Sequence, residues 1–358
     1  MFLMFFRQTT VIANANVISE IVSTENIALK TKTNFVKRLF LFLALLIICL
    51  SCQKEGLHIP DLGRKIVING LVIEDSLLKV RISKSLYYND HLSSPFDSGL
   101  VNANVFFFED DKIIDTLKYR YGGETWNVYG SLCENYYSSK KSVSTGKEYK
   151  VLVQAPGLPD AWASTNIPGR VRIEKMDTSH LMMPPDPYHS NDNWILLLCN
   201  LTFTDPPGET NYYMVSVDIK PRVWRDSHLL LYTQDIIGEE KMTEPNGIYA
   251  IAFSDKAING TRYSLQIGLN THEIGLPFID DRPTMDGVPY YTEHRKVIYI
   301  KLYSITEDYF NFLRTYNLYR TNYGDALAEP IMIYSNISGG YGIFGGASVS
   351  CDSLVFTY

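Results

Sequence analysis

Glycines near the C-terminus have the spacing of a dinucleotide-binding motif, G-x-G-x-x-G. Residues 340–345 read Gly-Tyr-Gly-Ile-Phe-Gly, and this spacing brings backbone N–H groups against a pyrophosphate when a helix follows. Here Ala347 to Tyr358 has the composition of a strand instead. We therefore predict that these glycines pack against a neighbouring strand. The large apolar residues among them, Ile343 and Phe344, are then expected to be inserted in the core.

Acidic and histidine side chains between residues 272 and 294 are the candidates for metal ligands. They are His272, Glu273, Asp280, Asp281, Asp286, Glu293 and His294. A hard cation requires several oxygens from one loop at alternating spacing, and zinc requires a third ligand at helical spacing. Neither pattern is present, and the sequence contains no nucleophile elbow. We therefore expect solvated loop residues, no metal or other cofactor, and no enzymatic activity.

The segment that ends at Cys52 is typical of an exported lipoprotein. Lys37 and Arg38 precede an apolar run of 12 residues, Leu39 to Leu50, and Ser51 then precedes the cysteine. This run has the length of a signal-peptide core and is too short to span a bilayer stably. The sequence predicts a signal peptide over residues 1–51 and acylation of Cys52, for example with palmitate, so that the protein is held to a membrane. Cys49 stands where a lipobox usually has leucine.

The residues on either side of the lipobox refine this prediction. Initiation near residues 29–35 would give a leader of ordinary length, so we expect the true start to lie downstream of Met1. Residues 52–64 are polar, with Pro60 and Gly63, and are predicted to be a lipidated tether. Gln53, Lys54 and Glu55 resemble a short surface-export signal. They indicate an outer-membrane location with the protein facing the cell exterior.

The charge and the cysteines exclude other classes of protein. The net charge is −6 although residues 1–51 carry five basic and two acidic groups, so the body is more acidic than the whole chain. An acidic body without a basic stripe argues against nucleic-acid binding. Cys133, Cys199 and Cys351 are too widely spaced for a zinc motif or a dense disulfide framework. One disulfide among them is possible, but we favour three buried thiols that behave as small apolar groups.

Strand patterns occupy most of the body. Short β-branched or alternating segments predict an immunoglobulin-like β-sandwich over residues 65–170 and a second, larger antiparallel β domain over residues 193–358. Residues 171–192 contain Pro184, Pro185 and Pro187 and are predicted to be a proline-rich linker, because each proline removes a backbone donor. The fold class is therefore all-β.

One short amphipathic helix is expected within the second β domain. Ser304 and Glu307 have the spacing of a capping box. Behind them, apolar side chains recur every three or four residues at Tyr309, Phe312, Leu313 and Tyr316. This spacing predicts one apolar helix face that packs on a sheet.

Four sequence segments resemble one known family. They are Ile-Val-Ile-Asn-Gly-Leu-Val at residues 66–72, Phe203 to Tyr213, Phe253 to Tyr263, and Ile333 to Gly346. Together with the lipobox they are similar to the uncharacterised Bacteroidota lipoproteins grouped as domain of unknown function 4249. The resemblance covers residues 52–358. It implies an outer-membrane location and genes that often lie beside TonB-dependent receptors, and it implies no established activity or site residues.

These observations together favour a non-enzymatic outer-membrane lipoprotein that binds a ligand or assists a TonB-dependent transporter. An adhesin-like or structural surface protein is the first alternative, and an extracytoplasmic hydrolase is the second. Trp126, Tyr129, Tyr136 and Tyr137 are candidates for an aromatic recognition surface. Most of these rings are expected to lie in the core instead.

Overall fold

The computed structural model describes ten parts of the chain, all within the compact unit Gly63–Tyr358. These parts are residues 63–87, 90, 99–127, 130–183, 194–220, 231–233, 241–243, 249–270, 295–322 and 329–357. Their strands are β1 (Ile66–Ile73), β2 (Leu77–Lys84), β3 (Asn104–Glu109), β4 (Lys112–Thr116), β5 (Lys118–Asn127), β6 (Gly130–Ser142), β7 (Glu148–Gln154), β8 (Ala161–Asn166), β9 (Lys175–Met183), β10 (Trp194–Thr204), β11 (Tyr212–Lys220), β12 (Leu231–Thr233), β13 (Lys241–Thr243), β14 (Tyr249–Ser254), β15 (Arg262–Asn270), β16 (Arg295–Ile305) and β17 (Tyr341–Thr357). Their helices are α2 (Glu307–Thr321) and the short 3₁₀ turn η2 (Asp255–Ala257).

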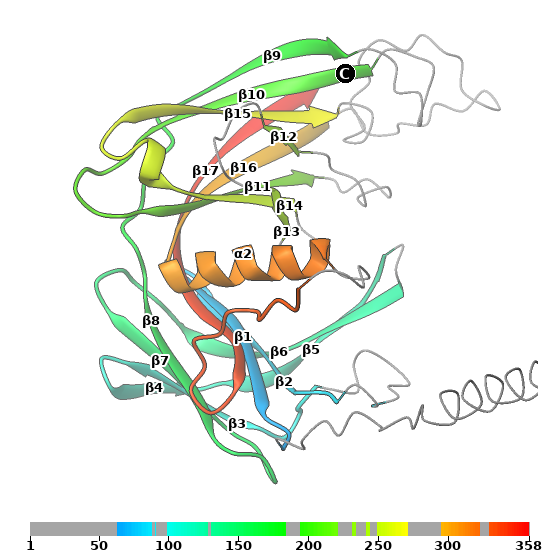
Figure 1. Ribbon diagram of the computed structural model, residues 1–358, viewed down its shortest axis with the longest axis vertical. Coiled ribbons are helices and arrows are strands. Elements are labelled where there is room, and N and C mark those ends of the chain that lie inside the picture. Colours follow the sequence, from blue (N-terminus) through cyan, green and yellow to red (C-terminus); the bar gives the residue numbers. More distant parts are fainter. Residues whose placement is uncertain are drawn as a thin grey trace, which may run out of the picture. The chain divides into compact units, whose positions relative to one another are not determined.

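The strands form three sheets (Figure 1). Sheet A has nine strands in the order β13-β14-β11-β16-β17-β1-β2-β6-β5, and two four-stranded sheets accompany it. Sheet B has the order β4-β3-β7-β8, and sheet C has the order β12-β15-β10-β9. The prediction of an all-β protein with antiparallel sheets and one short helix is confirmed.

Sheet B packs face to face on the β1–β2 part of sheet A. Residues alternate between the two faces of a strand, and β7 places Tyr149, Val151 and Val153 inward with no exposed surface. They share a core with Ile66 and Ile68 of β1. This arrangement is a β-sandwich, and its core also includes Ile337 and Phe344 from near the C-terminus.

A second core lies between sheet C and the β11–β16 part of sheet A. Leu197, Cys199 and Leu201 of β10 pack there with Val215 of β11 and Ile300 of β16. These five side chains are fully buried. The same alternation of apolar side chains therefore produces two sandwiches in one compact unit.

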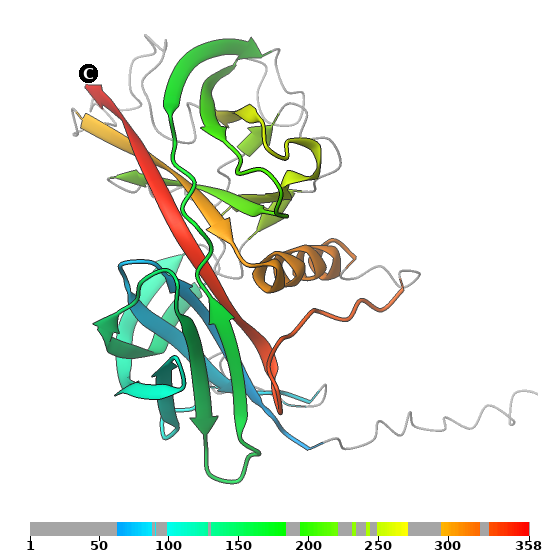
Figure 2. The same ribbon diagram turned by 90° about the vertical axis from the view of Figure 1, so that its left-hand side faces the viewer.

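Strand β17 joins the two sandwiches, because it pairs with strands of both. Its first part is parallel to β1, from the pair Val67–Tyr341 to the pair Ile73–Ala347. The rest is antiparallel to β16 (Figure 2). Strands from both sides of the predicted linker therefore belong to one sheet. The parallel pair was not predicted, because no local signal in a sequence says which distant strands will pair.

Part of the predicted linker is a strand. Residues 171–192 include β9, which pairs with β10 at the edge of sheet C. An edge strand needs ladder hydrogen bonds on one side only. Pro184, Pro185 and Pro187, on which the linker prediction depended, lie outside the described residues.

The glycine-rich segment is largely strand rather than loop, and its apolar pair is buried as predicted. Phe344 is completely buried and Ile343 is 2% exposed. Gly342 has φ of +102°, and a Cβ placed on it would lie 2.1 Å from the carbonyl oxygen of Ile68. Asn336 fixes the other side: its Oδ1 accepts from the Phe344 N–H at 3.0 Å and its Nδ2 donates to the Phe344 carbonyl at 2.9 Å. Glycine at residue 342 therefore allows the close approach that inserts Phe344.

Helix α2 forms with the predicted apolar face but without the predicted capping box. Its N-cap is Thr306, which makes no side-chain cap hydrogen bond. Ser304 still belongs to β16, and its hydroxyl accepts from the Val171 N–H at 3.4 Å. The capping-box prediction is wrong because Ser304 is still paired within the sheet, with Tyr213 of β11 and Ser348 of β17, two residues before the N-cap. Phe312 and Leu313 are buried on sheet A as expected.

Two buried aspartates hold the loop between β10 and β11. Asp205 accepts from the Tyr213 hydroxyl at 2.5 Å and from the Gly260 N–H at 2.8 Å. Asp255 accepts from the Asn211 N–H at 2.8 Å. Both aspartates are almost fully buried, and a buried carboxylate must be hydrogen-bonded. These bonds fix the loop against the turn between β14 and β15.

We expect Phe344→Ala to lower the free energy of unfolding by about 3–5 kcal/mol, because it leaves a cavity where sheet A meets sheet B. Chemical denaturation of the purified variant measures this loss. Tyr341→Ala is the matched control, since this ring on the same strand is 42% exposed and its removal should cost about 1 kcal/mol or less. An unchanged transition midpoint for Phe344→Ala would contradict the core assignment.

Tyr213→Phe should lower the free energy of unfolding by about 2 kcal/mol at neutral pH, because buried Asp205 loses a donor. Burial, and then the bond to Asp205, raise the pKa of Tyr213 above its usual 10. A raised phenol pKa stabilises the fold below pH 10, and this contribution is lost as the pH rises further. The variant should therefore lose stability less steeply above pH 10, by up to about 1.4 kcal/mol per pH unit.

Tyr212→Phe is the control for this prediction, because Tyr212 also donates to a carboxylate but at an exposed site. Its loss at neutral pH should be about 1 kcal/mol or less. Equal losses in the free energy of unfolding for the two variants would show that the buried Tyr213–Asp205 bond stabilises the fold no more than the exposed Tyr212–Glu307 bond.

Candidate functional site

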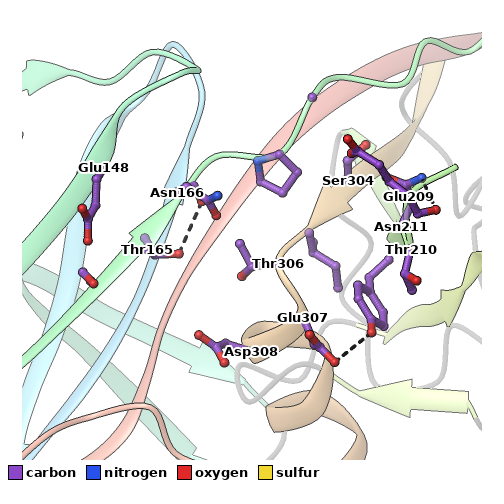
Figure 3. Close-up of a pocket in the computed structure, with 15 residues that line it drawn as sticks. Glu148, Thr165, Asn166, Glu209, Thr210, Asn211, Ser304, Thr306, Glu307 and Asp308 are labelled. Atoms are coloured by element: carbon purple, nitrogen blue, oxygen red, sulfur yellow. Dashed lines mark hydrogen bonds between the residues drawn. The ribbon is translucent and has the colours of Figure 1, made fainter. Parts of the chain in front are cut away.

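A cleft of about 680 Å³ lies where four segments of the chain meet. Figure 3 shows Glu148, Thr165 and Asn166 on one side and residues 209–211 with Ser304 on the other, and Thr306, Glu307 and Asp308 lie between them. Pro168 and Gly169, on the connection that leaves β8, also line it. The cleft is therefore built from the ends of β7, β8 and β16, the start of α2 and the β10–β11 loop.

Local sequence explains why these segments end at the cleft. Pro168 lacks a backbone donor, so the connection after β8 cannot continue the ladder there. Strand β16 ends at Ile305, and α2 begins two residues later with Glu307. The β10–β11 loop is held on its other side by Asp255, whose carboxylate binds the Asn211 N–H. The walls of the cleft are thus fixed by contacts outside it.

The cleft is acidic. Glu148, Glu209, Glu307 and Asp308 line it, and none of the described residues that line it carries a positive charge. Glu307 and Asp308 lie in the first turn of α2, where the helix dipole favours negative charge. Glu148 and Glu209 are exposed. Such a lining offers acceptors to a ligand that carries N–H or O–H donors.

Tyrosines hold two of these carboxylates in place. The Tyr212 hydroxyl donates to Glu307 at 2.9 Å. Burial, and then this hydrogen bond, raise the pKa of Tyr212 to about 12. Tyr334 donates to Asp308, and its pKa is likewise raised to about 12, first by burial. Both phenols are therefore protonated donors at neutral pH.

The predicted lipidation and export residues, Cys52, Gln53, Lys54 and Glu55, lie outside the described residues. The same holds for the candidate metal ligands between residues 272 and 294. Among the residues that the structure does describe, no cluster of side chains could hold a metal ion. In this part of the chain no helix combines the length and the apolar character needed to cross a bilayer.

The candidate aromatic surface is not assembled as one site. Tyr137 is 3% exposed, and its hydroxyl donates to the Leu100 carbonyl at 2.9 Å, so it belongs to the core. Tyr136 is half-buried, with the Lys79 ammonium 5.1 Å from its ring centroid. The side chain of Trp126 and all of Tyr129 lie outside the described residues.

Two of the three body cysteines are free thiols. Cys199 is buried, and burial raises its pKa to about 12, so it is a protonated apolar group as expected. Cys351 is a free but exposed thiol, so its predicted burial is wrong. It lies on the part of β17 that pairs with β16, where the outer residues face solvent. The side chain of Cys133 is not described.

Sequence reasoning did not find the cleft, because its residues are spread from residue 148 to residue 308. Two local signals pointed to its walls without joining them. The segment Asp205-Pro206-Pro207-Gly208 has the composition of a turn, and the apolar spacing from Tyr309 onward predicted the helix. Only the pairing of β17 with both β1 and β16 brings them together with β8.

Comparison with known proteins assigns the whole body to one group. No curated protein matches the sequence. One family model matches residues 56–352, which include nearly all of the described strands and every residue named in the cleft. The chain therefore belongs to the family described as Domain of unknown function (DUF4249).

Proposed function

We propose that this protein is a non-enzymatic lipoprotein of the outer membrane that binds a ligand, or a partner segment, beside a TonB-dependent transporter. The observation that carries the binding role is the acidic cleft at the junction of the two sandwiches. The anchoring role is supported by the leader, the lipobox at Cys52 and the polar tether that follows. Gln53, Lys54 and Glu55 support display on the cell exterior.

The cleft chemistry narrows the class of ligand. Two carboxylates, Glu307 and Asp308, are already held by tyrosine hydroxyls, whereas Glu148 and Glu209 are exposed on opposite walls. A ligand between them gains most from cationic or hydroxyl donors, because charge-assisted hydrogen bonds are the strong ones. A basic loop of a membrane receptor and an amine-bearing or polyhydroxylated solute both satisfy this requirement.

An adhesin-like or structural surface role is the alternative that a different observation favours. Strand β17 ties both sandwiches into one sheet, as a rigid spacer would require. A hydrolase is a third candidate, which only the carboxylates of the cleft support. Partner identity separates the three: a transporter favours the accessory role, and host protein or surface glycan favours adhesion.

Cys52→Ala should abolish membrane anchoring, because the thiol that accepts the acyl chain is removed. The measurement is labelling of expressing cells with a palmitate analogue, followed by detergent phase separation. Cys49→Ala is the matched control and should keep both the label and the detergent partition. A Cys52→Ala protein that still labels and enters the detergent phase would contradict the anchor.

Binding at the cleft is tested by mild-detergent pull-down from outer membranes, with partners identified by mass spectrometry. Glu148→Lys combined with Glu209→Lys should reduce recovery of the partner at least tenfold, because two acceptors become donors of the wrong charge. The control pair is Glu329→Lys with Asp352→Lys, which are exposed and lie outside the cleft lining. Equal recovery with both pairs would remove the cleft from the proposal.

A further inference from the structure

The outer face of sheet B carries a cluster of large apolar side chains where a solvent-facing sheet is usually polar. The register places Phe106, Leu152 and Trp162 side by side across β3, β7 and β8. The next row holds Ile113, Phe108 and Lys150 across β4, β3 and β7. The inner face of the same strands packs on sheet A and is fully buried at Phe107 and Val151. The outer face therefore carries a cluster of large apolar side chains, next to polar ones such as Glu148, Ser164 and Asn166 that alternate along the same strands.

The side chains at two edges of this outer patch are exposed to solvent. Trp162 is 42% exposed and Ile113 is 59% exposed, while Phe106, Phe108 and Leu152 are half-buried. Directly opposed side chains of neighbouring strands lie about 5 Å apart, so the rows form a continuous surface rather than scattered residues. A continuous exposed apolar surface marks an interaction site.

A lysine lies in the centre of the patch. The Lys150 ammonium is 4.7 Å from the ring centroid of Trp162 and 5.8 Å from that of Phe108. An ammonium that lies over aromatic rings at a sheet surface suits the boundary between acyl chains and phosphate headgroups, where aromatic and cationic side chains gather. Its charge is complementary to anionic headgroups.

The apolar rows lie toward the end of sheet B from which the tether leaves. The N–H of Trp162 donates to the Ser338 carbonyl at 3.0 Å. A Cβ on Gly340, two residues later, would lie 2.4 Å from the Ile66 carbonyl and 3.0 Å from the Ala161 Cβ. Ile66 begins β1, three positions after Gly63, and Gly63 follows Cys52 by 11 positions. That tether spans roughly 40 Å at most, so this end of the sheet lies within that distance of any membrane that holds Cys52.

We propose that the outer face of sheet B, made of Phe106, Phe108, Lys150, Leu152 and Trp162, docks on the lipid surface in which the protein is anchored. The inference rests on the proposed anchoring at Cys52 and adds a second contact. Trp162 and the two phenylalanines enter the headgroup boundary, and Lys150 meets lipid phosphates. The patch thus adds apolar contacts and one cation to the acyl anchor, as a second membrane signal does.

The test links the chain to vesicles chemically, so that it does not depend on acylation in cells. The chain from Cys52 onward, with Cys133→Ser and Cys351→Ser, is coupled through Cys52 to a maleimide lipid in anionic vesicles. Tryptophan emission is compared with and without lipids brominated near the headgroup. We expect clear quenching, and Trp162→Phe should remove at least half of it. Lys150→Glu should also reduce the quenching at least twofold.

Lys220→Glu is the matched control, because its ammonium also lies over a ring, 5.5 Å from the Tyr299 centroid, but on sheet A. It should leave the quenching unchanged, and thermal melts confirm that each variant is folded. Quenching that is equal in wild type and Trp162→Phe would overturn the proposal. Tryptophan emission that is not quenched by brominated lipid but changes when soluble oligosaccharides are added would also overturn the proposal. It would indicate that this face binds glycans. Loss of palmitate labelling in cells would count against the anchor alone.

Discussion

The architecture depends on how closely the backbone of β17 approaches its neighbours. A Cβ on Gly345 would lie 2.7 Å from the Tyr309 Cβ, and a Cβ on Gly346 would lie 1.7 Å from the Asn166 carbonyl oxygen. Real Cβ atoms do not come this close, so larger residues would push α2 or β8 away from the sheet. Glycine at these positions lets α2 and β8 pack directly on the strand that is parallel to β1 and antiparallel to β16. Through this strand the two sandwiches share sheet A.

The same strand creates the cleft. The Thr306 N–H donates to the Gly346 carbonyl at 3.0 Å, and the Gly346 N–H donates to the Thr306 hydroxyl at 3.2 Å. Gly346 therefore holds the start of α2 on one side, while its missing side chain leaves room for Asn166 on the other. The two walls that carry Glu148 and Glu307 are brought together by a residue that does not line the cleft. Substitution there would alter binding through position rather than through contact.

Sequence patterns predicted what depends on local geometry. Period-two alternation predicted β7, three-to-four spacing predicted the buried face of α2, and the burial of Phe344 followed from a large residue among glycines. Interactions between distant segments were not predictable. The parallel β1–β17 pair is one example, and the pairing of Ser304 with β11 and β17, which keeps it in the sheet and out of the helix cap, is another. The cleft is also formed by distant segments, and no single wall has a sequence pattern that predicts a cleft.

Strands β7 and β8 connect the two proposed surfaces. Glu148 pairs with Asn166 at the cleft end of these strands, and Leu152 pairs with Trp162 near the tether end. Four positions along β8 separate Trp162 from Asn166, which is roughly 13 Å of strand, and the Lys150 row of the patch lies between them. Negative charge beside anionic headgroups is unfavourable. The docked orientation is therefore the one in which the Trp162 row lies nearest the lipid and the Glu148 row lies farthest from it, which leaves the cleft open to a partner that projects from the membrane.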